Sequence, residues 1–202
     1  MATHTNNDKF YKLACYFESS LVIIAIILGW FSGIDPFKNI IFSEPAIIIG
    51  LLGTLPLLLL FIAFNRINNK HLLQIRQILL DTFGPAMHKH HWTDLLVLAA
   101  IAGIAEEILF RGVIQPWMES SWGMTAGLIG SNIIFGLVHA VTPLYAILAA
   151  LVGIYLGLAL DYGEHRNLLT PIIIHGLYDF LAFQIILSYY RAQKQNPSTS
   201  ET

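Results

Sequence analysis

The chain has 202 residues, of which 55% are hydrophobic and only 12% are charged. Soluble domains carry about 25% charged residues, and a water-soluble chain with half that share could not cover its own surface, so the composition predicts a membrane protein. The formal net charge of −2 argues against a nucleic-acid partner, which would require a basic face. A single cysteine, Cys15, excludes an internal disulfide and a metal cluster built from several cysteines.

Apolar stretches recur along the chain, and each is long enough to cross the roughly 30 Å hydrocarbon layer of a bilayer as a helix. They predict about six transmembrane helices, at residues 13–31, 45–64, 94–115, 123–141, 144–160 and 168–190. The fourth and fifth are divided by Thr142-Pro143. The expected fold is therefore all-α, a polytopic bundle whose polar residues lie between the third, fourth and sixth helices.

The segment between the second and third predicted helices has a different pattern. Leu72, Ile75, Leu79 and Phe83 recur at three- and four-residue spacing among charged residues, which predicts an amphipathic helix on the membrane surface. The first helix lacks an obvious small-residue cleavage site, so it is expected to stay in place as a signal anchor. The chain then divides into a polar tail (1–12), two anchoring helices with the interfacial helix (13–92), a core with the polar intramembrane residues (93–190) and a polar, disordered tail (191–202).

The distribution of lysine and arginine predicts the orientation of the chain in the membrane. One side carries Lys9, Lys12, Arg66, Lys70, Arg76, Lys89, Arg191 and Lys194. The other side carries only Lys38 and Arg166. Because positive residues accumulate on the cytoplasmic side, both termini are expected to be cytoplasmic.

Ionisable side chains inside the predicted helices are concentrated in the third, fourth and sixth, where they are Glu106, Glu107, Arg111, His139, His175 and Asp179. A charged group at the centre of a bilayer costs at least ~2.5–3.5 kcal/mol on insertion scales, so it needs a partner or a function. Glu107 and Arg111 are four residues apart and can form an ion pair, and so can His175 and Asp179. Glu106 lies about 100° round the helix from Glu107 and faces another neighbour. We therefore expect a shared polar site between the three helices.

Three kinds of chemistry fit these residues. A glutamate and a histidine can activate water, while a second imidazole stabilises an oxyanion. Glu106, His139 and His175 also match the ligands of a catalytic zinc with one open position, although two histidines one turn apart with a glutamate between them are absent, which slightly favours a metal-free site. A proton relay in a transporter is the third possibility. The loop histidines, His88, His90 and His91, are interpreted as solvated rather than metal-binding.

Three short motifs occur in order on separate predicted helices. They are Glu106-Glu107-Ile-Leu-Phe-Arg111, Phe135-Gly-Leu-Val-His139 and His175-Gly-Leu-Tyr-Asp179. Together they resemble the CPBP family of intramembrane proteases, also called Abi or CAAX prenyl endopeptidase type II-like. The resemblance covers about residues 94–190, roughly half of the chain.

The resemblance implies an endopeptidase that cuts membrane-associated proteins or peptides, in a multi-pass protein of a bacterial inner membrane. It implies that Glu106 and His139 activate water and that His175 and residue 179 stabilise the oxyanion. Both a zinc-dependent and a metal-free glutamate mechanism have been proposed for the family, and we favour the metal-free one. Residue 179 is Asp where the eukaryotic branch has Asn, and an ionised carboxylate cannot donate a hydrogen bond, so Asp179 must either be protonated or orient His175.

Two other classes of function remain as alternatives to a protease. The first is a non-catalytic membrane protein that keeps the motifs for packing, such as a bacteriocin self-immunity factor or a scaffold. The second is a proton-coupled transporter, which usually shows repeated halves with broken helices in corresponding positions. Here the ionisable residues within the predicted helices are concentrated in the C-terminal half, which counts against a transporter.

Overall fold

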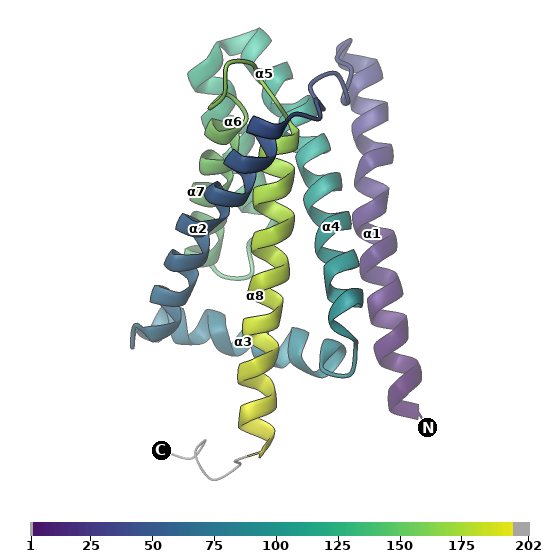
Figure 1. Ribbon diagram of the computed structural model, residues 1–202, viewed down its shortest axis with the longest axis vertical. Coiled ribbons are helices and arrows are strands. Elements are labelled where there is room, and N and C mark those ends of the chain that lie inside the picture. Colours follow the sequence, from purple (N-terminus) through teal and green to yellow (C-terminus); the bar gives the residue numbers. More distant parts are fainter. Residues whose placement is uncertain (1, 196–202) are drawn as a thin grey trace.

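The computed structural model describes residues 2–195, with side chains described from residue 7 onward. Every regular element in this part of the chain is a helix, as Figure 1 shows. The elements are α1 (Ala2–Ser32), α2 (Glu44–Arg66), α3 (Lys70–Met87), α4 (Trp92–Leu109), the π-helical segment η1 (Phe110–Ile114), α5 (Gln115–Trp122), α6 (Met124–Val138), α7 (Pro143–Ala159) and α8 (Leu169–Gln195). The predicted all-α bundle of a polytopic membrane protein is confirmed.

Three helices are long and apolar enough to cross a membrane by length and composition: residues 7–32 of α1, all of α2, and all of α8. The apolar helices α6 and α7 are shorter. The third predicted helix corresponds to α4, which continues without a break through η1 and α5 as far as Trp122. Its charged residues set it apart from the three long apolar helices.

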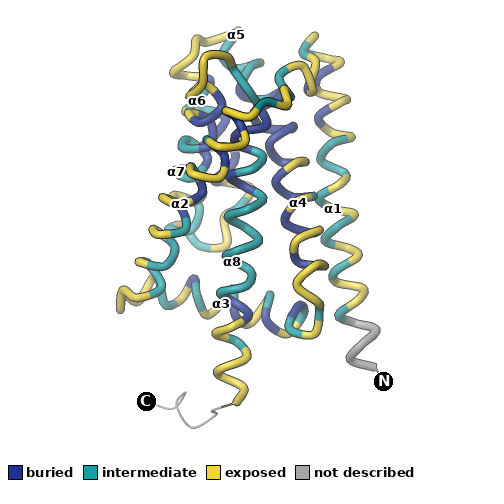
Figure 2. Tube along the Cα trace, viewed as in Figure 1, coloured by how far each residue is buried: buried dark blue, intermediate teal, exposed yellow. Residues whose placement is uncertain are grey.

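The helices α4 and α8 pack against each other and occupy the middle of the bundle (Figure 1). In addition, α1 packs against α4, and α2 packs against α8. The α6–α7 pair packs together on the far side of the view, with α5 against α6. Figure 2 shows that buried residues concentrate where α4 meets its neighbours, whereas α1 and α2 are largely exposed. Those exposed apolar surfaces are suited to contact with lipid.

The interfacial helix expected from the three- and four-residue spacing is α3, which lies crosswise at one end of the bundle (Figure 1). It begins at Lys70, where the Asn69 side chain accepts a hydrogen bond from the backbone N–H of His71 at 2.9 Å. Its buried residues include Ile75 and Leu80, which lie on its apolar face. The helix runs four residues beyond Phe83, where the predicted segment ended.

Both predicted tails differ from expectation. The polar N-terminal residues are helical, because α1 begins at Ala2 rather than near residue 13. At the other end, α8 continues to Gln195, so residues 191–195 of the predicted disordered tail are helical. Ala, Gln, Lys and Arg form this last stretch, and all are good helix formers. The remainder of that predicted tail, residues 196–202, lies outside the described part.

Candidate active site

A close crossing of α4 and α8 positions the polar residues. A Cβ atom at Gly103 would lie 2.7 Å from the backbone nitrogen of Gly176, a distance that real Cβ contacts do not show. The two backbones can therefore approach this closely only because glycine occupies position 103. Gly103 lies four residues before Glu107, and Gly176 directly follows His175. The crossing thus brings the carboxylates of α4 beside the histidine of α8.

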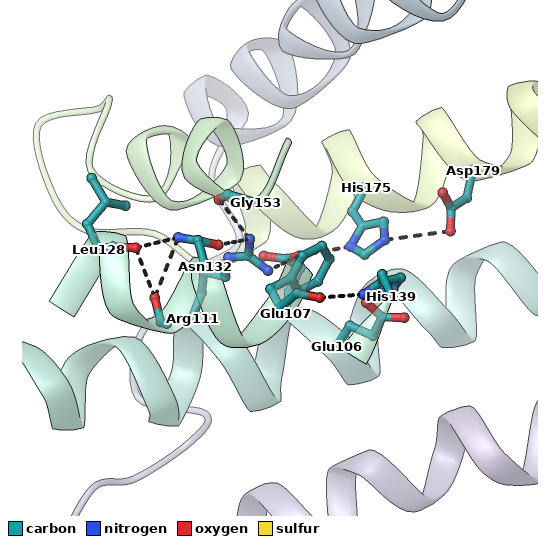
Figure 3. Close-up of polar contacts among 11 residues, drawn as sticks. Glu106, Glu107, Arg111, Leu128, Asn132, His139, Gly153, His175 and Asp179 are labelled. Atoms are coloured by element: carbon teal, nitrogen blue, oxygen red, sulfur yellow. Dashed lines mark hydrogen bonds and ion pairs between the residues drawn. The ribbon is translucent and has the colours of Figure 1, made fainter. Parts of the chain in front are cut away.

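Arg111 lies within η1, and its side chain is almost fully buried, with 1% exposed. Its Nη1 donates to Glu107 Oε1 at 2.9 Å, which is the ion pair expected from the four-residue spacing. Its Nη2 donates to Asn132 Oδ1 at 2.9 Å and to the carbonyl of Gly153 at 2.8 Å, as Figure 3 shows. The guanidinium carbon also lies 4.7 Å from the ring centroid of Phe135. One arginine therefore ties together η1, α4, α6 and α7.

His175 lies between two carboxylates (Figure 3). Its Nδ1 is 2.8 Å from Glu107 Oε1, and its Nε2 is 3.6 Å from Asp179 Oδ2. Because a carboxylate oxygen only accepts, Nδ1 carries the proton in the contact with Glu107. The spacing predicted Arg111 as the partner of Glu107, but the same oxygen also holds His175. Glu107 therefore orients the histidine as well as neutralising the arginine.

His139 and Glu106 form the second polar pair. The Nε2 of His139 is 3.5 Å from Glu106 Oε2, which is longer than a direct hydrogen bond. His139 is not inside its helix as predicted, because α6 ends at Val138 and His139 is the C-cap residue. Its Nδ1 lies 2.8 Å from the carbonyl of Phe135, which also accepts from the backbone N–H of His139 at 3.3 Å. This contact fixes the ring with Nε2 toward Glu106.

Sequence reasoning did not identify two of the groups around Arg111. Asn132 is fully buried in the otherwise apolar α6, and its Nδ2 donates to the carbonyl of Leu128 at 2.7 Å. Gly153 is a buried residue of α7. Any Cβ there would clash with Asn132 Oδ1 and lie 3.1 Å from Arg111 Nη2. A buried amide in a membrane helix was the available signal for Asn132, whereas a backbone acceptor such as the Gly153 carbonyl leaves no signal in a sequence.

No three His, Cys, Asp or Glu side chains among residues described by the structure gather closely enough to hold a metal ion. The loop histidines have other contacts. His91 caps α4 by accepting from the backbone N–H of Thr93, and His90 stacks on Tyr11 with 4.8 Å between ring centroids.

The fold and the site together define a polytopic integral membrane protein with carboxylate and histidine side chains buried within its helix bundle. Residues 88–181 match the model of the family described as Type II CAAX prenyl endopeptidase Rce1-like. This segment contains all three motifs, and the match confirms the resemblance. At the level of the family, the match supports a CAAX-protease-like intramembrane endopeptidase. Comparisons with curated proteins and with solved structures give no match.

Proposed function

We propose that this protein is an intramembrane endopeptidase that uses Glu106 and His139 to activate water and His175 with Asp179 to stabilise the oxyanion. The observation that carries the proposal is that the two adjacent glutamates have different contacts. Glu107 is engaged by Arg111 and His175. Glu106 faces His139 at 3.5 Å, and its Oε2 is buried without a hydrogen bond among the described residues, as is the second oxygen, Oε2, of Glu107. One carboxylate is structural, and the other is available for chemistry.

The contacts of His139 favour a role in binding the attacking water. Its Nδ1 faces a carbonyl oxygen, which only accepts, so the neutral ring carries its proton on Nδ1. The lone pair of Nε2 then faces Glu106 Oε2, and the two acceptors are 3.5 Å apart. A water molecule can donate one proton to each acceptor and keep a lone pair for attack on the peptide carbonyl. Glu106 takes the proton that water loses, and it can pass this proton to the leaving amine.

His175 and Asp179 are suited to stabilise the negative charge that forms on the carbonyl oxygen. Donation to that oxygen from Nε2 requires a proton on this nitrogen, which the imidazolium form supplies. Glu107 faces one nitrogen of the ring and Asp179 faces the other. Asp179 can therefore act as the group that orients His175, so the proposal does not need a donor at position 179. A positioned donor of this kind is worth about 10²–10³ in kcat.

The decisive experiment compares cleavage of a membrane-peptide library by the wild-type protein and by Glu106→Gln. The substitution preserves shape and removes the base, so kcat should fall by at least ~100-fold while the protein accumulates normally. The control is Glu164→Gln, which changes an exposed loop carboxylate and should cleave as the wild type does. Near wild-type cleavage by Glu106→Gln would remove the base from the mechanism. Absence of cleavage by the wild type across the library would instead favour a non-catalytic membrane protein.

We also propose that the reaction needs no metal. The supporting observation is that no group of three His, Cys, Asp or Glu side chains comes together as a set of metal ligands among the described residues. Purified protein should then keep its activity in a strong chelator and should contain no stoichiometric zinc. About one equivalent of zinc that disappears in both His139→Ala and His175→Ala protein would contradict this.

A further inference from the structure

Glu18 of α1 is an ionisable residue in the described bundle to which the mechanism above gives no role. In the structure, its Oε2 is buried and has no hydrogen-bond partner among the described residues. A carboxylate within a membrane helix is expensive without a partner, so its burial calls for a function.

The packing of α1 shows which way Glu18 faces. On the N-terminal side, Tyr11, Ala14 and Cys15 pack against a cluster that includes Leu95 and Leu98 of α4. On the C-terminal side, Leu21 and Ala25 pack with a cluster that includes Ile108 and Leu109 of the same helix. Glu18 lies midway between these two contacts, at the three- and four-residue spacing of one helix face. It therefore points at α4 between Leu98 and Ile108.

That stretch of α4 holds small buried residues and the proposed base. Ala102, Ala105 and Glu106 are all buried there, with at most 8% exposed. Glu18 thus faces the part of α4 that carries Glu106, although its own helix is outside the segment that matches the family.

The site holds more acidic side chains than basic ones. Its carboxylates are Glu18, Glu106, Glu107 and Asp179, and its cations are Arg111 and whichever of the two histidines are protonated. Arg111 is engaged by Glu107. Even with both histidines charged, the carboxylates outnumber the cations. In this low-dielectric setting, a positively charged group that approaches Glu18 is attracted, and a negatively charged group is repelled.

We propose that Glu18 is a specificity-determining residue that binds a lysine or arginine side chain of the peptide substrate near the scissile bond. This inference rests on the proposed protease function and names the class of substrate: cationic membrane-associated peptides. The cation of the substrate supplies the partner that the Glu18 carboxylate lacks. A lysine can reach it because its four-carbon stem packs against apolar surface while the ammonium group stays near the carboxylate.

The test uses peptides that carry lysine or its uncharged analogue norleucine at one position at a time. In the wild-type protein, lysine should raise kcat/KM over norleucine by about 10-fold or more at one position, mainly through KM. In Glu18→Gln this ratio should fall toward one, and Glu18→Lys should instead prefer glutamate there. Glu164→Gln is the matched control and should keep the wild-type ratio. Thermal unfolding in detergent verifies that each variant is folded.

Two results would overturn the inference. One is a wild-type protein without any lysine preference, or a preference that survives in Glu18→Gln. The other is an equal loss of cleavage for lysine and norleucine peptides in Glu18→Gln, which indicates a general structural role. Binding of the same peptides to Glu106→Gln and to Glu18→Gln/Glu106→Gln separates this inference from the proposed function. If lysine peptides bind in a way that depends on Glu18, but the wild type cleaves none of them, the role of Glu18 in binding is supported and the proposed protease function is contradicted.

Discussion

Arg111 and His139 belong to the same polar site, but they differ in burial and in the number of hydrogen bonds that hold them. Arg111 is fully buried and makes three hydrogen bonds to groups on three elements. His139 is 29% exposed, and the contact that fixes it is one backbone carbonyl in its own helix. Removal of the first should therefore affect folding, and removal of the second should affect chemistry.

We expect Arg111→Ala to lower the free energy of unfolding by about 3–5 kcal/mol, because Glu107 would be left as an uncompensated buried charge. The measurement is thermal or denaturant unfolding of the purified protein in detergent, together with its accumulation in the membrane. Arg66→Ala, at an exposed helix end, is the control and should change stability little. An Arg111→Ala protein as stable as the wild type would mean that the Glu107–Arg111 pair is not structural.

By contrast, His139→Ala should reduce cleavage by about 100-fold or more while the protein accumulates at close to the wild-type level. The ring packs against Phe135, with 4.3 Å between centroids, so a modest loss of stability is expected. The activity assay and the unfolding assay are run on the same preparations. A His139→Ala protein that loses stability in proportion to activity would place this histidine in the packing of the bundle.

At the residue scale, helix periodicity predicted the contacts within one helix and missed most of those between helices. The four-residue spacing of Glu107 and Arg111, and of His175 and Asp179, corresponds to contacts that the structure contains. The contact of Glu107 with His175 depends on how α4 crosses α8. No short-range pattern in a single sequence predicts that crossing. The contact of Arg111 with the Gly153 carbonyl likewise depends on how the helices pack.

At the element scale, the crossing of α4 and α8 is the feature on which the site depends. We expect Gly103→Ala to separate the two helices, because the new Cβ would meet the backbone of Gly176. Backbone atoms cannot move aside as a flexible side chain can, so both stability and cleavage should fall. Cleavage should fall by about 10-fold or more, because a small displacement of catalytic groups strongly reduces the rate. Unfolding and peptide cleavage measure the two effects.

The matched control for Gly103→Ala is Gly163→Ala. Gly163 lies in the turn between α7 and α8, where an added Cβ would meet only the carbonyl of His165 at 3.7 Å. This variant should be close to the wild type in both assays. Equal behaviour of the two variants would show that the close approach at Gly103 does not control the position of His175.

The connection between α7 and α8 is fastened to α5 by Arg166, whose guanidinium bonds to Asp161 and Glu119 at 2.7 Å each. Hydrogen bonding to Asp161, followed by Glu119, raises the pKa of Arg166 above its ordinary value. A cation with a raised pKa adds stability below its unfolded-state pKa and loses it only as the pH rises through the folded-state value. For arginine this window lies above any working pH.

Arg166→Met should therefore lower the free energy of unfolding by about 1 kcal/mol, a value reduced for partial exposure, and by a similar amount at about pH 6 and about pH 9. Unfolding curves of both proteins at the two pH values provide the measurement. A difference between wild type and variant that disappears at the higher pH would contradict a persistently charged Arg166.

The order of elements could be predicted from the sequence because each depends on local composition. The break at Thr142-Pro143 corresponds to the start of α7 at Pro143, where the Thr142 side chain accepts from the backbone N–H of Tyr145. The π-helical turn that holds Arg111 had no such signal, since it contains ordinary helix-forming residues apart from Gly112. Element ends were predicted less well, because the polar ends of α1 and α8 continue as helix.

At the scale of the whole molecule, the N-terminal end of α1 and the C-terminal end of α8 lie at the same end of the bundle as α3 (Figure 1). His90, in the turn before α4, lies 4.0 Å from Asp8 of α1, and Arg191 of α8 donates to the carbonyl of His88 in the same turn. The positive residues predict that this end is cytoplasmic. Lys38 and Arg166 lie in the connections at the opposite end.

This orientation predicts that reporters fused after Gln195 and in the α3–α4 turn are both cytoplasmic. Green fluorescent protein should fluoresce at both positions, whereas alkaline phosphatase should be inactive there and active when inserted at Gly163. The 163 insertion serves as the internal control, because it lies in the connection on the opposite side. Active phosphatase at the C-terminal fusion would reverse the orientation.

One oxygen atom, Glu107 Oε1, accepts from both Arg111 and His175. Replacement of a buried ion pair by apolar residues of similar volume is often neutral or stabilising in other proteins. In this chain the same exchange would remove the anchor of a proposed catalytic histidine along with the charge. Selection for a more stable bundle and selection for activity therefore act on one carboxylate. A descendant that lost its enzymatic role and kept the fold would be free to replace Glu107 and Arg111 together with hydrophobic side chains.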